Sequence, residues 1–338
     1  DKEDDPYFCN RDWANVLGAI DFINSYDGEK PLCIYLPLTF PHPPYGVEEP
    51  WFSLTDRNKV PERAPAPEGW RGKPSILEGI WKKQNMQSWT EDRWTELRAV
   101  YYGMCSRLDH QFGLLTDAMR SAEIYDDSAV FLFSDHGDFT GDYGLVEKTQ
   151  NTFEDVLSRV PFIVKPPKVS GVKPRVSDAI VELVDFSATV FELTGIEPGY
   201  THFGKSLLPL LRGDTEEHRD AAFCEGGRLT GESQAMELPS LQKAGGLSMY
   251  MPRIALQTSD EHPWHTKAVM CRTKEYKYTR RHYESDELYD LRKDPKEMDN
   301  LIDDPAYADV LIALKERMLQ WYMETCDVVP MQGDERNF

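Results

Sequence analysis

The sequence predicts an α/β fold in which helices cover both faces of a mostly parallel central sheet, followed by a smaller antiparallel sheet with a packed helix. Continuous apolar runs alternate with long amphipathic helices in the first part of the chain, and shorter strand candidates crowd the last part. Strands without polar alternation are buried on both faces, which is typical of parallel sheets. We predict a large domain over residues 1–212 and a smaller one over residues 213–338.

Two helices and a strand are predicted in the N-terminal part of the chain. Apolar residues recur at helical spacing from Arg11 to Ser25, and the apolar run from Leu32 to Phe40 is expected to form a buried strand. Residues 41–87 are rich in proline and are interpreted as a long functional loop. Thr90 is the expected N-cap of a long helix with acidic residues in its first turn.

The alternation continues beyond this helix. Ala129 to Phe133 and Val160 to Val164 are predicted strands, and a polar loop with several glycines lies between them. A short helix is expected to open at Asp185 and to end at Gly195. The later part is predicted to hold three strands and a final helix with Asp304 as its cap: Ala268 to Arg272, Tyr276 to Arg280 and Glu287 to Leu291 are the strands.

The composition describes a globular, strongly acidic protein. Hydrophobic residues make up 40% of the 338 residues, which argues against disorder, and no apolar run approaches the ~20 residues that span a bilayer. The formal net charge of -20 repels polyanions, so nucleic acid is excluded as a partner. An anionic substrate therefore needs a local positive pocket or a metal ion.

The cysteines and the first residues bear on the origin of the chain. The six cysteines lack CxxC spacing and are interpreted mainly as free thiols, which leaves the redox compartment open. The chain starts with Asp1, and its first residues are acidic where a signal peptide is basic and then apolar. We expect the native N-terminus to lie outside this sequence.

The strongest chemical signal lies between Phe131 and Lys148, where an apolar strand runs directly into Asp135-His136-Gly137. In open α/β sheets, sites form beyond the carboxyl ends of strands. A carboxylate and an imidazole at that point can bind one divalent ion, and a glycine permits an unusual turn. On these residues alone, a capping aspartate beside a surface histidine is the simpler interpretation.

The order of the surrounding motifs changes this interpretation. Ser134-Asp-His-Gly is followed by Gly141-Asp-Tyr-Gly-Leu, by Lys148 and by Arg159-Val-Pro-Phe-Ile-Val-Lys-Pro-Pro. Phe40-Pro-His-Pro-Pro-Tyr precedes them, and Gly204-Lys-Ser-Leu-Leu-Pro-Leu-Leu, Arg272-Thr-Lys-Glu-Tyr-Lys-Tyr and Glu287-Leu-Tyr-Asp-Leu-Arg-Lys-Asp-Pro follow. In this order, over roughly residues 30 to 325, the chain resembles the sulfatase family of the alkaline phosphatase superfamily. The resemblance implies an alkaline phosphatase-like fold.

The resemblance implies roles for four residues, and the position of a fifth, beside Trp264, makes it a further candidate. Asp135 and His136 correspond to metal ligands, and Lys148 to a group near the sulfate, where an ammonium stabilises the ester oxygens. His42 corresponds to the group that protonates or polarises the leaving-group oxygen. His265 is a candidate for the substrate pocket, with a position in a surface loop as the other interpretation.

Simpler roles stay open for several residues. Lys148 could be a solvated loop lysine, and His42 a turn histidine between prolines. Tyr143 stands where one form of the family motif has histidine, which puts a supporting role at that position in doubt. Asp109 and His110 lie within the predicted long helix and are expected to pack. The tryptophans of the proline-rich loop could stack on sugar rings or pack within the loop.

The resemblance also implies a nucleophile and a metal. In the family, a formylglycine made from Cys or Ser in a Cys/Ser-x-Pro-x-Arg motif attacks sulfur, and paired aspartates before it complete the metal site. The 338 residues do not contain that motif, so we expect the nucleophile upstream of Asp1 and expect this chain alone to be inactive. The expected metal is Ca²⁺, although the nitrogen of His136 also suits Mn²⁺ or Zn²⁺.

Three functions stay open at this point. The first is a sulfuric ester hydrolase acting on a small-molecule or oligosaccharide sulfate ester, the second a phosphate or phosphonate ester hydrolase, and the third a non-catalytic binding module. The resemblance favours a periplasmic or secreted protein. The sequence does not identify the sugar, the position of its sulfate or the oligomeric state.

Overall fold

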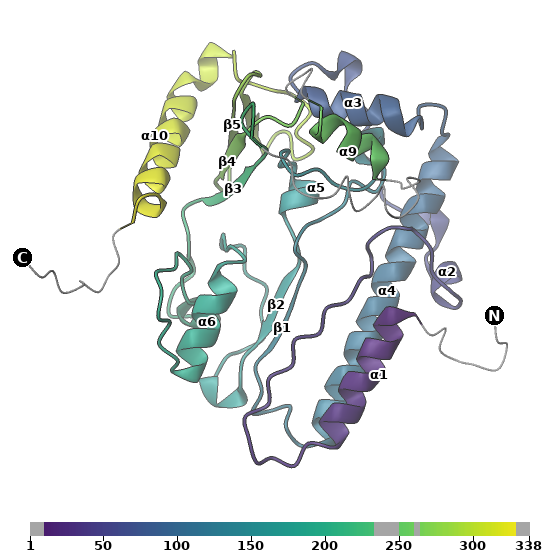
Figure 1. Ribbon diagram of the computed structural model, residues 1–338, viewed down its shortest axis with the longest axis vertical. Helices are drawn as coiled ribbons and strands as arrows, with labels where there is room; N and C mark the ends of the chain where they lie inside the picture. Colours follow the sequence, from purple (N-terminus) through teal and green to yellow (C-terminus); the bar gives the residue numbers. More distant parts are fainter. Residues whose placement is uncertain (1–9, 233–249, 260–263, 329–338) are drawn as a thin grey trace, which may run out of the picture. The chain divides into compact units, whose positions relative to one another are not determined.

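The computed structural model describes residues 10–232, 250–259 and 264–328. Contacts between residues divide the chain into two compact units (Figure 1). Unit 1 comprises residues 1–66, 84–148 and 160–170, and unit 2 comprises residues 67–83, 149–159 and 171–338. The boundary expected between residues 212 and 213 stays a prediction.

Unit 1 is built on two helices that were both predicted. α1 (Arg11–Asn24) begins at Asn10, whose side chain accepts a hydrogen bond from the Trp13 backbone N–H at 3.1 Å. α4 (Glu91–Ser121) begins at Thr90, which caps the Arg93 N–H. The two helices lie side by side (Figure 1), with Trp13 buried and its ring edge-on to His110 at 6.1 Å between centroids.

The stretch from Leu32 to Phe40 is not the buried strand that its apolar residues predicted. It has no regular secondary structure, Tyr35 is 84% exposed, and no strand pairs with it among the described residues. Its end is held by Asp12 of α1, whose carboxylate accepts hydrogen bonds from the N–H groups of Thr39 and Phe40, each at 2.8 Å. Apolar character alone does not make a strand, because a strand needs a partner for its backbone.

The proline-rich loop contains four short helical segments. Two of them, α2 and η1, belong to unit 1, and η2 and most of α3 belong to unit 2. Their bounds are Trp51–Leu54 for α2, Arg57–Lys59 for η1, Glu68–Trp70 for η2 and Ser75–Gln84 for α3.

The predicted strands on either side of the glycine-containing loop are present as β1 (Val130–Phe133) and β2 (Phe162–Lys165). They pair antiparallel, with Phe133 opposite Phe162. Among the described residues of unit 1 this is the only sheet, so the parallel pairing expected for a central sheet is not observed there. Parallel strands need a crossover connection, usually a long helix. The connection from β1 to β2 has no such helix, because α5 (Asp155–Ser158) has only four residues.

Unit 2 contains an antiparallel sheet in the order β3-β4-β5-β6. β4 (Ala268–Arg272), β5 (Tyr276–Arg281) and β6 (Glu287–Asp290) confirm the three predicted strands, whereas β3 (Ala222–Gly226) was not predicted. The described part of unit 2 also contains the helices α6 (Asp185–Thr194), α7 (Leu208–Arg212) and α9 (Met251–Gln257). Gly195 ends α6 with φ 68°, a conformation that suits glycine.

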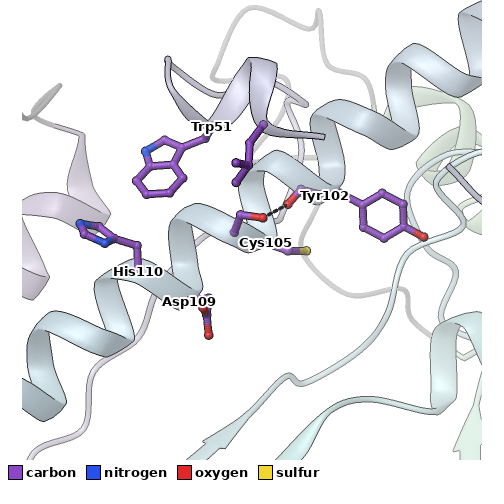
Figure 2. A pocket seen from close by; sticks show the side chains of 7 residues that line it. Trp51, Tyr102, Cys105, Asp109 and His110 are labelled. Atoms are coloured by element: carbon purple, nitrogen blue, oxygen red, sulfur yellow. Dashed lines mark hydrogen bonds between the residues drawn. The ribbon is translucent and has the colours of Figure 1, made fainter. Parts of the chain in front are cut away.

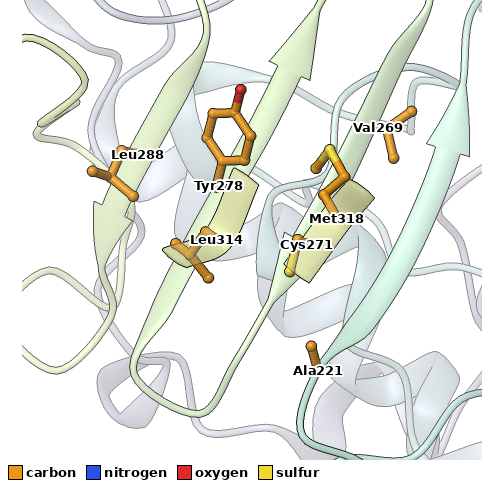
Figure 3. Packing of buried hydrophobic residues seen from close by; sticks show 7 residues of the cluster. All are labelled: Ala221, Val269, Cys271, Tyr278, Leu288, Leu314 and Met318. Carbon is orange, nitrogen blue, oxygen red and sulfur yellow. The ribbon is translucent and has the colours of Figure 1, made fainter. Parts of the chain in front are cut away.

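α10 (Ala308–Thr325) packs on this sheet, which confirms the predicted helix-on-sheet arrangement of the C-terminal part. Asp304 caps the 3₁₀ turn η5 (Pro305–Tyr307) that leads into it, accepting from the Ala306 N–H at 2.9 Å. Figure 3 shows the core between helix and strands, formed by Ala221, Val269, Cys271, Tyr278, Leu288, Leu314 and Met318. In the described ranges, no helix is long and apolar enough to cross a membrane.

Candidate active site

The loop after β1 turns sharply and points a carboxylate outward. Ser134 donates a hydrogen bond from its hydroxyl to the His136 carbonyl at 2.7 Å, and Asp135 accepts one from the His136 N–H at 2.9 Å. The side chain of Asp135 is nevertheless 84% exposed, so most of its acceptor capacity faces solvent. The predicted position at the carboxyl end of an apolar strand is therefore found for both residues.

The hydrogen bond made by His136 assigns the protons of its ring. Nδ1 lies 2.8 Å from the Gly137 carbonyl oxygen, and because a carbonyl only accepts, Nδ1 carries the hydrogen. Nε2 keeps its lone pair and lies 3.7 Å from a carboxylate oxygen of Asp135. A lone-pair nitrogen beside an exposed carboxylate is a donor pair suited to a divalent cation.

His42 is held in the same way from the proline-rich loop. Its backbone N–H donates to the Thr39 carbonyl at 2.9 Å, and its Nδ1 lies 2.7 Å from the Pro43 carbonyl oxygen. Nδ1 is therefore the protonated nitrogen, and Nε2 is left as an acceptor. The ring lies near that of His136, with 6.5 Å between centroids.

Lys148 completes the cluster. Its Nζ lies 3.0 Å from Nε2 of His42 and 3.3 Å from a carboxylate oxygen of Glu147, and its side chain is 18% exposed. The structure thus brings His42 of the proline-rich loop together with His136 and Lys148 of the loop after β1, with Asp135 beside His136. Lys148 is not a fully solvated lysine, and its role near an anion stays a prediction.

His265 is the fifth predicted site residue and belongs to unit 2, whereas the other four belong to unit 1. It lies in a turn before β4, is half-buried, and its carbonyl accepts from the Arg228 N–H at 3.0 Å. A role for His265 in the substrate pocket stays a prediction.

The sequence interpretation overlooked two residues behind the cluster, Tyr45 and Asp138. The Tyr45 hydroxyl donates to the Asp138 carboxylate, 2.8 and 2.9 Å from its two oxygens, and accepts from the Glu147 N–H at 3.0 Å. Tyr45 ends one of the motifs that carry the resemblance and Asp138 directly follows another, but only the fold shows that they are partners. Tyr143, by contrast, is 1% exposed and packs edge-on against Phe139.

The residues suit a metal ion only in part. Asp135 and His136 offer one oxygen and one nitrogen, and the described residues hold no group of three or more His, Cys, Asp or Glu that could bind a metal ion. Calcium takes about 6 to 8 oxygen ligands, so two protein groups do not define its site. These residues can contribute to a metal site but do not form one by themselves.

A shallow pocket lies elsewhere in unit 1, between α2 and α4 (Figure 2). The indole of Trp51 faces the His110 imidazole there, with 5.0 Å between ring centroids. Burial raises the pKa of the Cys105 thiol to about 11, so that thiol is not an activated nucleophile. The pocket contains none of the predicted site residues, and the contact between the two rings agrees with the packing role predicted for His110.

Two protein-family models match this chain, one over its N-terminal part and one near its C-terminal end. A family model described as Sulfatase matches residues 1–196. A second model, described as N-sulphoglucosamine sulphohydrolase, C-terminal, matches residues 259–324. Unit 1 lies entirely within the first of these regions, and strands β4 to β6 with nearly all of α10 lie within the second.

Individual relatives match most of this chain. Choline-sulfatase of Rhizobium meliloti is 26% identical over 326 residues, which cover 93% of this chain and 56% of that protein. Delta 4,5-hexuronate-2-O-sulfatase of Bacteroides thetaiotaomicron is 24% identical over 316 residues, covering 91% and 55%. The chain thus spans little more than half the length of these curated relatives.

Solved structures show the same fold. The crystal structure of phosphonate monoester hydrolase of Agrobacterium radiobacter has a TM-score of 0.71 and 23% identity, and the match covers 91% of this chain and 60% of that chain. The likeness confirms the predicted alkaline phosphatase-like α/β class.

Proposed function

Because this chain belongs to the sulfatase family, we propose that it forms part of a sulfuric ester hydrolase that removes sulfate from a sulfated carbohydrate. The observation that carries the proposal is the 3.0 Å approach of Lys148 Nζ to His42 Nε2, beside the turn that bears Asp135 and His136. An ammonium stabilises the negative charge that develops on ester oxygens, and an imidazole exchanges a proton with the leaving group.

The hydrogen bonds assign the proton chemistry to definite atoms. His42 donates from Nδ1 to the Pro43 carbonyl, so Nε2 is the nitrogen that would exchange a proton with the leaving-group oxygen. Lys148 hydrogen-bonds that same nitrogen and is the nearest source of a proton for it. In this proposal, Lys148 binds the sulfate and also keeps Nε2 directed at the ester.

Two parts of the reaction require more than these residues. We assign Asp135 and His136 as ligands of a divalent metal ion. The expected ion is Ca²⁺, the usual metal of the family, with Mn²⁺ or Zn²⁺ as alternatives. When bound, the ion would neutralise charge on the sulfate. The Cys/Ser-x-Pro-x-Arg motif does not occur in the 338 residues, so the formylglycine nucleophile would come from elsewhere in the protein. The 338-residue chain alone should then be inactive.

A sulfated carbohydrate is favoured as the substrate by the relative named a hexuronate-2-O-sulfatase and by the family model named for N-sulphoglucosamine sulphohydrolase. The net charge of -20 makes a local cation necessary for any such anion, and Lys148 supplies one. His265 is retained as a proposed contact to the sugar.

One observation favours a second function. The likeness to a phosphonate monoester hydrolase supports phosphate or phosphonate esters as alternative substrates of the same groups. A non-catalytic binding module is the third possibility, and it would retain the cluster without turnover.

The test compares aryl sulfate, aryl phosphate and an aryl phosphonate monoester as substrates of the full-length protein, with metal content measured on the same preparation. Preferred turnover of the sulfate supports the proposal. Preferred turnover of the phosphonate selects the second function, and binding of sulfated sugars without turnover of any ester selects the third. Comparable turnover by the 338-residue chain would place the nucleophile within it and overturn the assignment.

A further inference from the structure

The loop that leads to Lys148 is held in an unfavourable backbone conformation. Thr140, Tyr143 and Glu147 have φ values of 44°, 57° and 70°. These values lie in the left-handed region, which residues other than glycine rarely adopt. Gly141 also has a positive φ, 98°, and an added Cβ there would lie 3.1 Å from the Trp94 ring. Such conformations persist only where the surroundings fix them, and they concentrate at functional sites.

Glu147, the residue just before Lys148, is fixed by three backbone hydrogen bonds. Its carbonyl accepts from the Phe139 N–H at 3.0 Å. Its own N–H points at the Tyr45 hydroxyl at 3.0 Å and at an Asp138 carboxylate oxygen at 3.3 Å. The direction in which the chain enters Lys148 therefore depends on those two side chains.

Tyr45 connects the turn at Glu147 to the loop that carries His42. It lies three residues after His42 in the proline-rich loop, and its hydroxyl both donates to Asp138 and accepts from Glu147. Burial, together with the charge of Asp138, raises the pKa of Tyr45, so the hydroxyl keeps its proton and remains a donor. One buried hydroxyl thus joins the loop that carries His42 to the loop that carries Lys148.

We propose that Tyr45 is a positioning residue that sets Lys148 against His42 by fixing the left-handed turn at Glu147. The inference rests on the proposed function and deepens it, because it assigns the geometry of the Lys148–His42 pair to a residue that touches neither substrate nor reacting atoms. Without the hydroxyl, the Glu147 N–H loses one acceptor and Asp138 loses its donor from the other loop. The turn can then relax, and the distance between Nζ and Nε2 is no longer defined.

The test is Tyr45→Phe in the full-length protein, with Tyr26→Phe as the matched control. The Tyr26 hydroxyl also donates one hydrogen bond, to the Lys30 carbonyl at 2.7 Å, but on an exposed surface. We expect Tyr45→Phe to lower kcat by about 10-fold to 100-fold with KM changed less than about 3-fold, because misplacing a transition-state contact costs turnover more than binding. Tyr26→Phe should leave both constants unchanged.

A double-variant comparison separates positioning from general weakening of the fold. In a Lys148→Ala background, Tyr45→Phe should lower kcat by less than about 2-fold, because the group that it positions is already gone. A full 10-fold loss in that background would overturn the proposal. Unchanged kcat for Tyr45→Phe in the otherwise unaltered protein would overturn it as well.

A second readout requires no turnover and so stands apart from the proposed function. The ¹⁵N shifts of the His42 ring, measured in the full-length protein, should show Nδ1 protonated and Nε2 as an acceptor. Tyr45→Phe should move the Nε2 shift, because Nε2 loses its hydrogen bond from Lys148 while Nδ1 keeps the Pro43 carbonyl, and Tyr26→Phe should not. If the protein hydrolyses none of the three esters, the proposed function fails, and unaltered ring shifts in Tyr45→Phe would then also refute the positioning role.

Discussion

Two clusters of charged residues, one in each unit, use similar groups in opposite ways. In unit 2, Lys277 is 1% exposed, and its Nζ contacts the carboxylates of Asp155 and Glu297 and the carbonyl of Phe153. In unit 1, Lys148 contacts an imidazole and one carboxylate, and the neighbouring Asp135 side chain is 84% exposed. One lysine is almost completely buried among oxygen acceptors, and the other keeps 18% of its side chain exposed beside an imidazole and a buried carboxylate.

This difference distinguishes ionic groups that stabilise the fold from ionic groups that can bind a ligand. A buried ammonium surrounded by carboxylates and a carbonyl holds strands and loops in place, and it has no capacity left for a ligand. The exposed Asp135 carboxylate beside the His136 imidazole stabilises the fold little and can accept a ligand. Exposure of the groups in a cluster, rather than residue type, therefore indicates which cluster is the candidate site.

The largest expected effect is on stability, at Lys277. Lys277→Met leaves the buried Glu297 carboxylate without the ammonium that contacts it and leaves Asp155 with Arg272 alone, which should cost about 3 to 5 kcal/mol of unfolding free energy. Urea unfolding of the full-length protein, followed by circular dichroism, measures the loss. A loss under about 1 kcal/mol would mean that the two carboxylates find other partners, and the contrast between the clusters would weaken.

The largest expected effect on turnover is at Lys148. Lys148→Ala should lower kcat on the preferred ester by about 100-fold or more, because it removes charge stabilisation from the transition state. Because the Lys148 side chain is only 18% exposed and its Nζ lies 3.3 Å from the buried Glu147 carboxylate, the melting temperature should fall as well, and kcat is therefore compared at a temperature at which both proteins are folded. Lys59→Ala is the matched control, because the Lys59 side chain is 84% exposed and its Nζ lies 3.7 Å from an Asp56 carboxylate oxygen. Equal activity of the Lys148→Ala variant and the parent would reject the assigned role.

The fold was predictable where a local rule was sufficient. Capping residues and helical spacing located α1 and α4, and Gly195 marked the end of α6. The strand predicted from Leu32 to Phe40 was wrong, because no strand pairs with these apolar residues among the described residues. β3 (Ala222–Gly226) was not predicted, because it contains glutamate and glycine, which are uncommon in strands. Its residues form a strand by pairing with β4.

The sequence could name the residues of the candidate site, whose roles stay predictions, but it could not show the network around them. The ordered motifs pointed to His42, Asp135, His136 and Lys148, and the structure places them near one another within unit 1. The sequence could not show that Tyr45 bonds to Asp138, since 93 residues separate the two, nor that Glu147 adopts a left-handed conformation. Those facts depend on tertiary contacts, and no local pattern encodes them.

A smaller effect should appear in acid, at Asp155. Burial alone would raise the pKa of this carboxyl, but the charges of Lys277 and Arg272 outweigh it and lower the pKa from 3.8 to about 2. Because the folded-state value is depressed, the stabilisation is present above the ordinary pKa and is lost as the pH falls toward 2. The shift corresponds to about 2 kcal/mol. Urea unfolding between pH 5 and pH 2 should therefore lose less stability in Asp155→Asn than in the parent, and parallel pH curves would contradict the assignment.

The smallest expected effect is at Lys82, which serves as the exposed counterpart of Lys277. Its Nζ lies 2.6 Å from a Glu78 carboxylate oxygen one helical turn earlier in α3, a shorter distance than the 2.7 Å between Lys277 and Glu297. The Lys82 side chain is 61% exposed, so water and salt screen the pair, and helix pairs of this spacing contribute about 0.3 to 0.5 kcal/mol. Lys82→Met makes the same substitution as Lys277→Met in the same unit, and its cost in unfolding free energy should be about tenfold lower. The remaining effect should also fade in high salt, whereas the loss at Lys277 should persist, because buried charges are screened far less. If both variants lost similar stability, distance rather than burial would decide the strength of these ion pairs, and the distinction between the two clusters would not hold.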